Sequence, residues 1–401
     1  RLKAPAEALR GGGARPARGG GEAPRPGRAM GAAAASPLQS LGLQRGPVTA
    51  KESGDGRSDA LGLLWAFSAM QGWRPSMEDA HFAIPQLGAH ASSSRARARA
   101  SSAWSSAAMF GVLDGHGGEQ VARFCERHLP TEIAGSRLGE DTTNSLVNAF
   151  HRMDELLVSP DSQQELVALS NGASTVWGQR QVQPENVGCT AVVCCVRPDT
   201  YIVANAGDSR AVLCRRGKAI DLSEDHKPNL PTERSRIEKA GGFITEKDVG
   251  LPSPVYRVNG DLTCSRAIGD LRHKRNTSAA PQDQVVISTP DVRVVRREPG
   301  DEFAVLACDG IWDVLSSQQV IDLLRPQVAA IREGKMRASA VVEGLLDYCL
   351  TPDPAKTRGI GSDNMTVVLV TFLGGGQHAP EGGAPAPGSS LCSPGLGSLC
   401  T

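Results

Sequence analysis

Four apolar runs in the chain have the composition of buried strands, and each has an acidic residue at one end. They cover residues 108–113, 201–206, 303–308 and 365–372. A carboxylate at such a place is costly unless water, a partner or a metal compensates its charge. A single Asp-Gly pair would indicate no more than a turn, because that pair also marks ordinary hairpins. The repetition of the pattern favours one shared site over unrelated turns.

The acids at these strand ends could all serve as oxygen ligands. Asp114 follows the first run, Asp208 the second and Asp309 the third, and Asp363 precedes the fourth. A ligand set made only of oxygens is typical of hard divalent cations such as Mg²⁺ or Mn²⁺. Zinc is disfavoured, because the chain contains neither His-Glu-x-x-His nor Cys-x-x-Cys.

The remaining apolar pattern predicts further strands and several amphipathic helices. Strands are expected at 63–70, 189–196 and 210–214, and short turns around the 201–206 run indicate an antiparallel meander. Helices are expected at 121–129, 146–157, 232–240, 316–324 and 336–350. Ser316 and Gln319 form a capping box for the fourth helix, which Pro326 should break or kink. This order of elements favours an α+β fold with two packed, mainly antiparallel sheets flanked by helix pairs.

Composition divides the chain into a central domain and two polar ends. We predict a disordered N-terminal extension over residues 1–60, one domain over 61–373 and a disordered Gly/Pro/Ser tail over 374–401. Within the domain, an exposed Ser/Ala/Arg loop is expected at 89–107, an irregular loop at 160–188 and a flap over the site at 247–256.

Charge, cysteines and hydropathy narrow the classes of function. The chain has 43 Lys/Arg and 43 Asp/Glu, but residues 1–29 are basic, so the remainder is mildly acidic and gives no support to nucleic-acid binding. Ten cysteines without a regular framework favour a reducing compartment.

With no apolar run of about 20 residues and no secretory signal, we expect no integral membrane segment and a cytoplasmic or nuclear location. Met30-Gly31 is similar to an N-myristoylation start, but Ala35 stands where Ser or Thr is required, which disfavours N-acylation.

The chain resembles the metal-dependent Ser/Thr protein phosphatases of type 2C. Each matching motif is short, but the motifs occur in the family's order between Leu61 and about Phe372. They are Met70-Gln71-Gly72-Trp73-Arg74, Met77-Glu78-Asp79-Ala80-His81, Asp114-Gly115-His116-Gly117-Gly118, Gly207-Asp208-Ser209-Arg210, Asp225-His226-Lys227-Pro228, Ser265-Arg266-Ala267-Ile268-Gly269-Asp270, Cys308-Asp309-Gly310-Ile311-Trp312-Asp313 and Ser362-Asp363-Asn364-Met365. The resemblance implies a four-layer αββα sandwich and a monomeric enzyme that hydrolyses phosphoserine and phosphothreonine in phosphoprotein substrates.

The resemblance also implies how two Mg²⁺ or Mn²⁺ ions would be bound. It makes Asp114 the bridging ligand, gives the Gly115 carbonyl to one ion, and gives Asp309 and Asp363 to the other. Two such ions can hold a bridging hydroxide and polarise a phosphoryl group, so that no protein nucleophile is needed.

Four further acids complete the expected metal site. The resemblance puts Glu78 and Asp79 near enough to the metals to bind them through water. Asp208 and Asp313 match the acids that some family members use for a third, weaker metal.

Two residues carry expected catalytic roles, each with a plainer alternative. Arg74 matches the family's phosphate-binding arginine, and the alternative is a surface arginine paired with Glu78. His116 matches the general acid that protonates the leaving oxygen, and the alternative is a histidine that only hydrogen-bonds a carboxylate. Arg266 and Asp270 are interpreted as a structural salt bridge.

Departures from the family pattern and rival classes leave this interpretation in place. Leu113 replaces a usual aromatic and Cys189 a usual serine, and both positions should be buried packing sites. A haloacid-dehalogenase phosphatase would need Asp where His116 stands, no cysteine has Arg six positions later, and no Gly-x-Ser-x-Gly occurs. A catalytically inactive member acting as a binding module is the alternative from another class, but such proteins usually lose metal acids that this chain keeps.

Overall fold

The computed structural model describes residues 46–87, 104, 106–135, 141–170, 175–176, 179–180, 184–250 and 254–373. The tail predicted at 374–401 and residues 1–45 of the predicted extension lie outside these ranges, as does the Met30-Gly31 segment.

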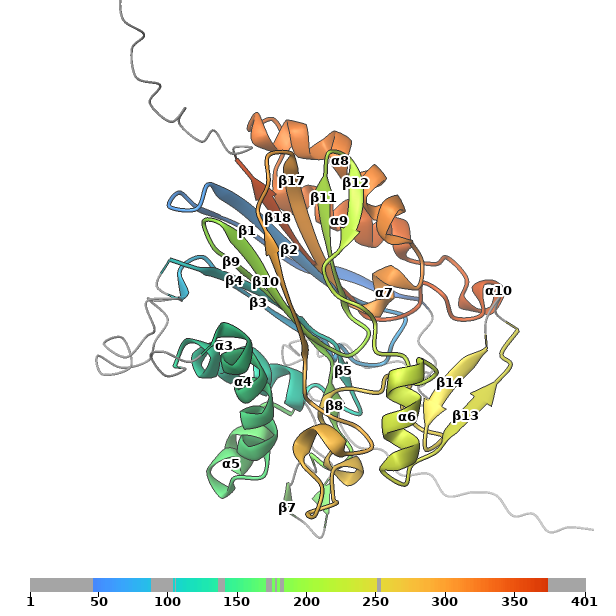
Figure 1. The fold of residues 1–401 in the computed structure, drawn as a ribbon. Helices are drawn as coiled ribbons and strands as arrows, with labels where there is room; N and C mark the ends of the chain where they lie inside the picture. Colours follow the sequence, from blue (N-terminus) through green and yellow to red (C-terminus); the bar gives the residue numbers. More distant parts are fainter. Residues whose placement is uncertain are drawn as a thin grey trace, which may run out of the picture. The chain divides into compact units, whose positions relative to one another are not determined.

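Two antiparallel sheets form the centre of the described part (Figure 1). The first sheet has six strands in the order β1 (Val48–Ser58), β2 (Leu63–Gly72), β18 (Met365–Phe372), β17 (Asp301–Ala307), β11 (Arg210–Arg215) and β12 (Lys218–Asp221). The second has five in the order β16 (Asp291–Arg296), β10 (Thr200–Ala206), β9 (Ala191–Val196), β4 (Ala108–Leu113) and β3 (Ala80–Ile84).

Helices cover the outer face of each sheet. The second sheet packs against α3 (Gln120–Ala134), α4 (Thr142–Leu157) and α5 (Pro160–Ala168), and the first against α8 (Ser317–Arg332) and α9 (Ala338–Cys349). The smaller elements are β5 (Gly115–His116), β6 (Thr175–Val176), β7 (Gln179–Arg180), β8 (Gly188–Cys189), α6 (Pro231–Lys239), β13 (Ile244–Lys247), β14 (Val255–Val258), β15 (Ile268–Gly269), η2 (Leu271–His273), η3 (Pro281–Asp283), α7 (Asp309–Trp312) and α10 (Pro354–Thr357).

The alternation of side chains along the strands of the two main sheets gives three of the four apolar cores of the described residues, and the fourth, smaller core includes Ile237 of α6 and Val258 of β14. On β4, Met109 faces the α3 side while Phe110 and Val112 face the other sheet. On β18, Leu369 faces the α8 and α9 side while Val368 faces between the sheets. Because successive side chains of a strand point to opposite faces, a strand buried on both faces reads as one continuous apolar run. These layers confirm the predicted αββα sandwich.

Two predictions about helices were wrong in detail. The segment 160–188, expected to be irregular, begins with α5, whose Leu166 is buried in the α3 and α4 core. The capping box of Ser316 and Gln319 is present, but α8 continues through Pro326 to Arg332. Buried Leu324 and Val328 anchor the helix on both sides of the proline, and that packing outweighs the lost backbone hydrogen bond.

The expected meander holds only for its first two strands. β9 pairs with β10, but β11 belongs to the other sheet, where it pairs with β17 and β12. The chain changes sheets at Gly207. Its φ of 129° is a backbone conformation that glycine adopts readily and other residues rarely do, and a Cβ there would lie 2.4 Å from the Thr190 side chain. This crossing places Asp208 between the two sheets' ends.

The predicted domain start at residue 61 was too late, because β1 precedes it. This strand is polar along most of its length and forms the sheet edge, so it lacks the apolar run that would reveal it. The rings of Phe67 and Trp65 lie over Gly54 and Gly56 on β1, where any Cβ would clash with them. The Asp55 carboxylate also accepts a hydrogen bond from the Ser339 backbone nitrogen of α9, at 2.6 Å.

Two truncations should therefore distinguish the contribution of β1 to stability from that of residues 1–45. We expect deletion of 1–60 to lower the melting temperature by on the order of 5 °C or more, since it uncovers β2 and its aromatic rings. Deletion of 1–45 should leave it within about 2 °C. Thermal unfolding followed by circular dichroism would measure both, and equal melting temperatures would show that β1 contributes little.

The loop predicted at 89–107 is not exposed at its C-terminal end. Trp104 and Ala107 are buried in the α3 and α4 core, and Leu87 donates a backbone hydrogen bond to the Ala107 carbonyl at 2.8 Å. The eight described cysteines are free and buried, as expected for small core residues. Among the described residues, no helix combines the length and apolarity that a membrane span requires.

Candidate active site

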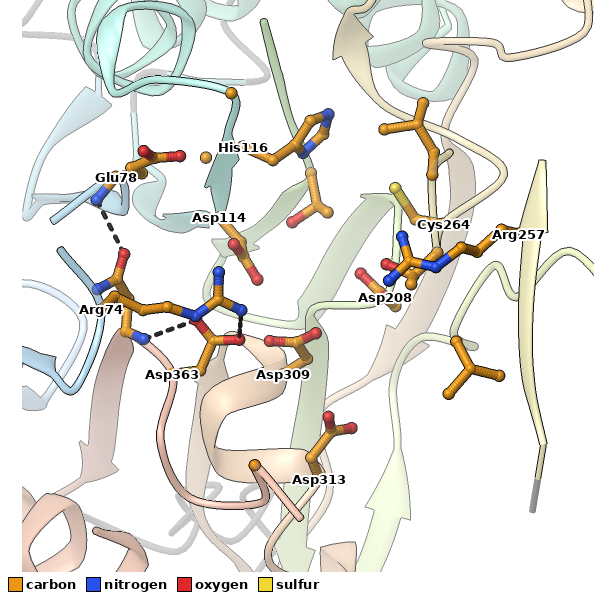
Figure 2. A pocket seen from close by; sticks show the side chains of 18 of the residues that line it. Arg74, Glu78, Asp114, His116, Asp208, Arg257, Cys264, Asp309, Asp313 and Asp363 are labelled. Atoms are coloured by element: carbon orange, nitrogen blue, oxygen red, sulfur yellow. Dashed lines mark hydrogen bonds and ion pairs between the residues drawn. The ribbon is translucent and has the colours of Figure 1, made fainter. Parts of the chain in front are cut away.

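The acids predicted from strand ends come together around one pocket (Figure 2). β4 and β17 end next to Asp114 and Asp309, while β18 begins just after Asp363. Antiparallel pairing brings the end of one strand beside the start of the next, so these acids come from both sheets to one place. They line a cavity of about 670 Å³.

All but one of the predicted site residues line this cavity. The lining contains Arg74, Glu78, Asp114, Gly115, His116, Asp208, Asp309, Asp313 and Asp363. Asp79 lies close to Asp114 but is buried, with 5% of its surface exposed. Val249 and Val255, both within the segment 247–256 for which a flap is predicted, also line the cavity.

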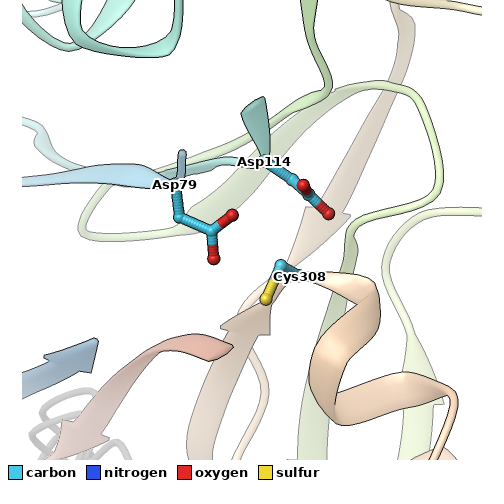
Figure 3. Close-up of side chains that lie close together, drawn as sticks. All are labelled: Asp79, Asp114 and Cys308. Carbon is cyan, nitrogen blue, oxygen red and sulfur yellow. The ribbon is translucent and has the colours of Figure 1, made fainter. Parts of the chain in front are cut away.

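Asp79, Asp114 and Cys308 form a compact group at the base of the site (Figure 3). Their potential ligand atoms all lie within 4.8 Å of one another. One Asp79 oxygen accepts a hydrogen bond from Thr366 Oγ1 at 2.7 Å, while the other, Oδ1, is buried without a partner in the described structure. Cys308 Sγ accepts from the Thr366 nitrogen at 3.1 Å and donates to the Asn364 carbonyl, so the protein already satisfies this thiol.

Like charges shift the titration of these carboxyl groups. Burial and then the neighbouring carboxylates, of which Asp309 is the strongest, raise the pKa of Asp114 well above its usual value. Burial and then Asp208 do the same to the pKa of Asp309. Burial raises the pKa of Asp79 to about 6. Burial and like charge both disfavour the ionised carboxylates, and a bound cation would offset both, so the buried oxygens, the unpartnered Asp79 oxygen and the neighbouring acids together fit a divalent cation.

Lys227 lies next to Asp208, and no role for it was predicted from the sequence. Its Nζ lies 2.5 Å from Asp208 Oδ2. Burial, the largest single cause, would raise the pKa of Asp208, but the charge of Lys227 and the hydrogen bonds to Lys227 and to the backbone together lower it. For Asp313, burial dominates and its pKa is raised. Asp208 thus already has a protein cation, unlike Asp114.

Arg74 pairs with Asp363 rather than with Glu78, so the suggested Arg74–Glu78 pair was wrong. Burial alone would lower the pKa of Arg74, but Asp363 outweighs it and raises the pKa. Glu78 instead accepts hydrogen bonds from Ser76 Oγ at 2.7 Å and from the Gly118 nitrogen at 3.1 Å.

Asn364 organises this side of the site, and sequence reasoning missed it. Its Oδ1 accepts from the Glu78 nitrogen at 2.9 Å, and its Nδ2 donates to the Gln71 and Ser76 carbonyls at 2.8 and 2.9 Å. One amide therefore fixes the segment between Gln71 and Glu78, which carries Arg74. Its position next to Asp363 in the Ser362 to Met365 motif was the available signal.

His116 Nε2 lies 2.6 Å from Asp270 Oδ2. Burial alone would lower the pKa of His116, but Asp270 outweighs burial and raises it. The predicted Arg266–Asp270 salt bridge was wrong, because Arg266 pairs with Glu233 at 2.7 Å and with Asp291 at 2.7 Å. Asp270 thus joins the site through His116.

Gly115 and the two departures from the family pattern are explained by packing. A Cβ at Gly115 would lie 2.1 Å from the Glu78 carbonyl oxygen, so the close passage of these backbones requires glycine. Leu113 and Cys189 are fully buried, as predicted.

Comparisons with known proteins agree with this geometry. The sequence model of the protein phosphatase 2C family matches residues 64–356. "Probable protein phosphatase 2C 11" of Oryza sativa subsp. japonica is 39% identical, with 81% of this chain and 89% of the relative covered. "Protein phosphatase 2C 1" of Paramecium tetraurelia is 37% identical, with 79% and 94% covered. A crystal structure of a phosphatase from Toxoplasma gondii is similar with a TM-score of 0.58 and 25% identity, covering 82% of this chain and 98% of that one.

The fold and the family match define a protein phosphatase. The chain belongs to the protein phosphatase 2C family. The prediction of a type 2C serine/threonine phosphatase is thereby confirmed.

Proposed function

We propose that this enzyme hydrolyses phosphoserine and phosphothreonine in proteins by direct attack of water on phosphorus, with two Mg²⁺ or Mn²⁺ ions held by its acid cluster. The observation that carries the proposal is the group of buried carboxylates from both sheets. Asp114 and Asp309 form no ion pair within the described residues, whereas the nearby cations Arg74 and Lys227 pair with Asp363 and Asp208. Without added positive charge, such a group must either take up protons or remain destabilised by burial and mutual repulsion.

Each acid has a proposed place in the metal site. Asp114 would bridge the two ions, the Gly115 carbonyl would bind one, and Asp309 and Asp363 would bind the other. The bound ions would activate a water molecule and withdraw charge from the phosphoryl oxygens.

The outer acids would complete the cation shells. Glu78 and Asp79 would act through water, which suits the buried Asp79 oxygen that has no protein partner. Asp208 and Asp313 would hold a third ion more weakly, since Lys227 already neutralises Asp208. Because Cys308 is hydrogen-bonded on both sides by backbone groups, the ligand set consists of oxygens, which favours Mg²⁺ or Mn²⁺ over zinc.

Arg74 and His116 would handle the substrate. The Arg74 side chain is 55% exposed at the cavity edge, so its guanidinium could bind two phosphate oxygens while it remains near Asp363. His116 would give a proton to the serine or threonine oxygen as the bond from that oxygen to phosphorus breaks. The water oxygen forms the new bond to phosphorus, and the products are a hydroxyl side chain and inorganic phosphate.

Metal removal tests this function. Excess EDTA should abolish phosphopeptide hydrolysis, and Mn²⁺ or Mg²⁺ added above the chelator should restore it, because acids without cations repel phosphate. Phosphate release from a phosphothreonine peptide measures both. Full activity in chelator would overturn the metal requirement, and no activity with either metal would favour an inactive binding module instead.

The expected state of the enzyme follows from the same interpretation. We propose that it acts on phosphoproteins as a monomer in a reducing compartment, which suits the eight free, buried thiols of the described residues. Light scattering after size-exclusion chromatography would show a dimer if this is wrong.

A further inference from the structure

Asp270 is a buried carboxylate whose closest polar neighbour is His116. Its side chain is fully buried, whereas that of His116 is 28% exposed and lines the cavity. The Oδ2 to Nε2 distance is 2.6 Å, and Oδ1 has no partner within the described residues. An ionised carboxylate only accepts hydrogen bonds, so the Nε2 hydrogen points to Asp270. The other ring nitrogen, Nδ1, is then left for a group in the cavity.

Hydrogen bonds from several segments hold the turn that carries Asp270. The φ of 48° and ψ of 40° of Asp270 are left-handed, which is uncommon outside glycine and tends to occur where the surroundings enforce it. The Asp270 nitrogen donates to the Val187 carbonyl at 3.0 Å. Asp154 of α4 accepts from the Gly269 nitrogen at 2.8 Å and from Lys274 Nζ at 2.7 Å, so it holds both sides of the turn.

Gly188 leaves room for the pair. It lies opposite His116 in the β5–β8 pairing. A Cβ at Gly188 would lie 2.2 Å from Asp270 Oδ2 and 2.7 Å from His116 Nε2. The backbone of β8 therefore closes over the contact, which keeps the carboxylate away from bulk water and directed at the imidazole.

We propose that Asp270 is the positioning residue of the general acid: it holds the His116 ring and its Nε2 hydrogen so that Nδ1 presents a proton to the leaving oxygen. This inference rests on the proposed function and adds to it a residue that touches neither substrate nor metal. A merely structural Asp270 would not need its partner to be a cavity-lining histidine. The clearance at Gly188 and the support from α4 serve the same contact.

The variant Asp270→Asn tests the role. Asparagine tolerates left-handed backbone, so the fold should persist, but its neutral amide neither fixes the Nε2 hydrogen nor stabilises a charged imidazole. We expect kcat for a phosphothreonine peptide to fall by about tenfold or more, with KM within about twofold. Hydrolysis of p-nitrophenyl phosphate, whose leaving group needs little protonation, should fall by less than about threefold.

A double-mutant cycle separates positioning from general damage. In a His116→Ala background, Asp270→Asn should reduce phosphopeptide hydrolysis no further, because the group that it positions is gone. Glu165→Gln is the matched control, because it also removes the charge of a carboxylate that is hydrogen-bonded to a histidine. Glu165 of α5 lies 2.8 Å from Nε2 of His128 of α3, and neither residue lines the cavity. That variant should leave the ratio of the two substrate rates unchanged.

Equal losses for both substrates, or losses that multiply with those of His116→Ala, would overturn the proposal. If Asp270→Asn unfolds, Asp154→Asn can be used instead, because Asp154 of α4 holds the turn that carries Asp270. An unchanged ratio of the phosphopeptide and p-nitrophenyl phosphate rates in that variant would count against positioning. A wild-type enzyme that hydrolyses no phosphopeptide with Mn²⁺ would instead refute the proposed function itself, so the two failures are distinguishable.

Discussion

Asp309→Asn should reduce phosphopeptide hydrolysis by on the order of 10²-fold or more. The substitution keeps the shape of the side chain but removes the negative charge that the proposed site directs at a cation. Only Cys308 separates Asp309, the first residue of α7, from the end of β17, so both elements fix its backbone. Phosphate release from a phosphothreonine peptide, measured over a range of Mn²⁺ concentrations, would show the loss.

The melting temperature of Asp309→Asn would distinguish the loss of a metal ligand from a general loss of folding. Asp309 repels Asp208, Asp313 and Asp363, so its neutralisation should leave the melting temperature of the metal-free protein unchanged or raise it. The rise in melting temperature on adding Mn²⁺, expected for the wild type, should become smaller.

A matched control distinguishes the position from the charge alone. Asp161→Asn changes an acid in the first turn of α5 outside the cavity lining and should leave turnover within about twofold. Wild-type turnover and an undiminished Mn²⁺ response in Asp309→Asn would remove Asp309 from the metal site.

Strands that are buried on both faces of their sheet were predictable from the sequence. β4 and β18 are fully buried and read as unbroken apolar runs. β1 was missed because an edge strand needs few apolar side chains of its own, and the rings of Trp65 and Phe67 on β2 cover its glycines. The crossing at Gly207 was missed because a short turn looks the same whether it joins neighbours in one sheet or strands of two sheets.

The site residues that were predictable are the acidic residues that end an apolar run. Asp114 and Asp309 stand out because a strand that ends in a carboxylate conflicts with simple burial. Asp270 does not stand out, because its partner His116 is 154 positions away and its neighbour Arg266 offered a simpler pairing. Asn364 likewise acts through backbone groups almost 300 positions away, which no local pattern reports.

His116→Ala should separate substrates by their leaving groups. A serine or threonine alkoxide is a poor leaving group and needs a proton in the transition state, whereas p-nitrophenolate is stable as an anion. We expect phosphopeptide hydrolysis to fall by on the order of 10²-fold or more and p-nitrophenyl phosphate hydrolysis to fall much less. Steady-state rates for both substrates at saturating Mn²⁺ would measure the difference.

The comparison is sharpest when metal binding is measured alongside. Calorimetric Mn²⁺ affinity should stay close to that of the wild type, because His116 contacts Asp270 rather than the acid cluster. His128→Ala is the matched control, as this histidine also hydrogen-bonds a carboxylate but lies outside the cavity lining, and both substrates should keep their rates. Equal losses for the two substrates in His116→Ala, with Mn²⁺ affinity preserved, would make His116 a structural residue and require the proton to come from another group in the cavity.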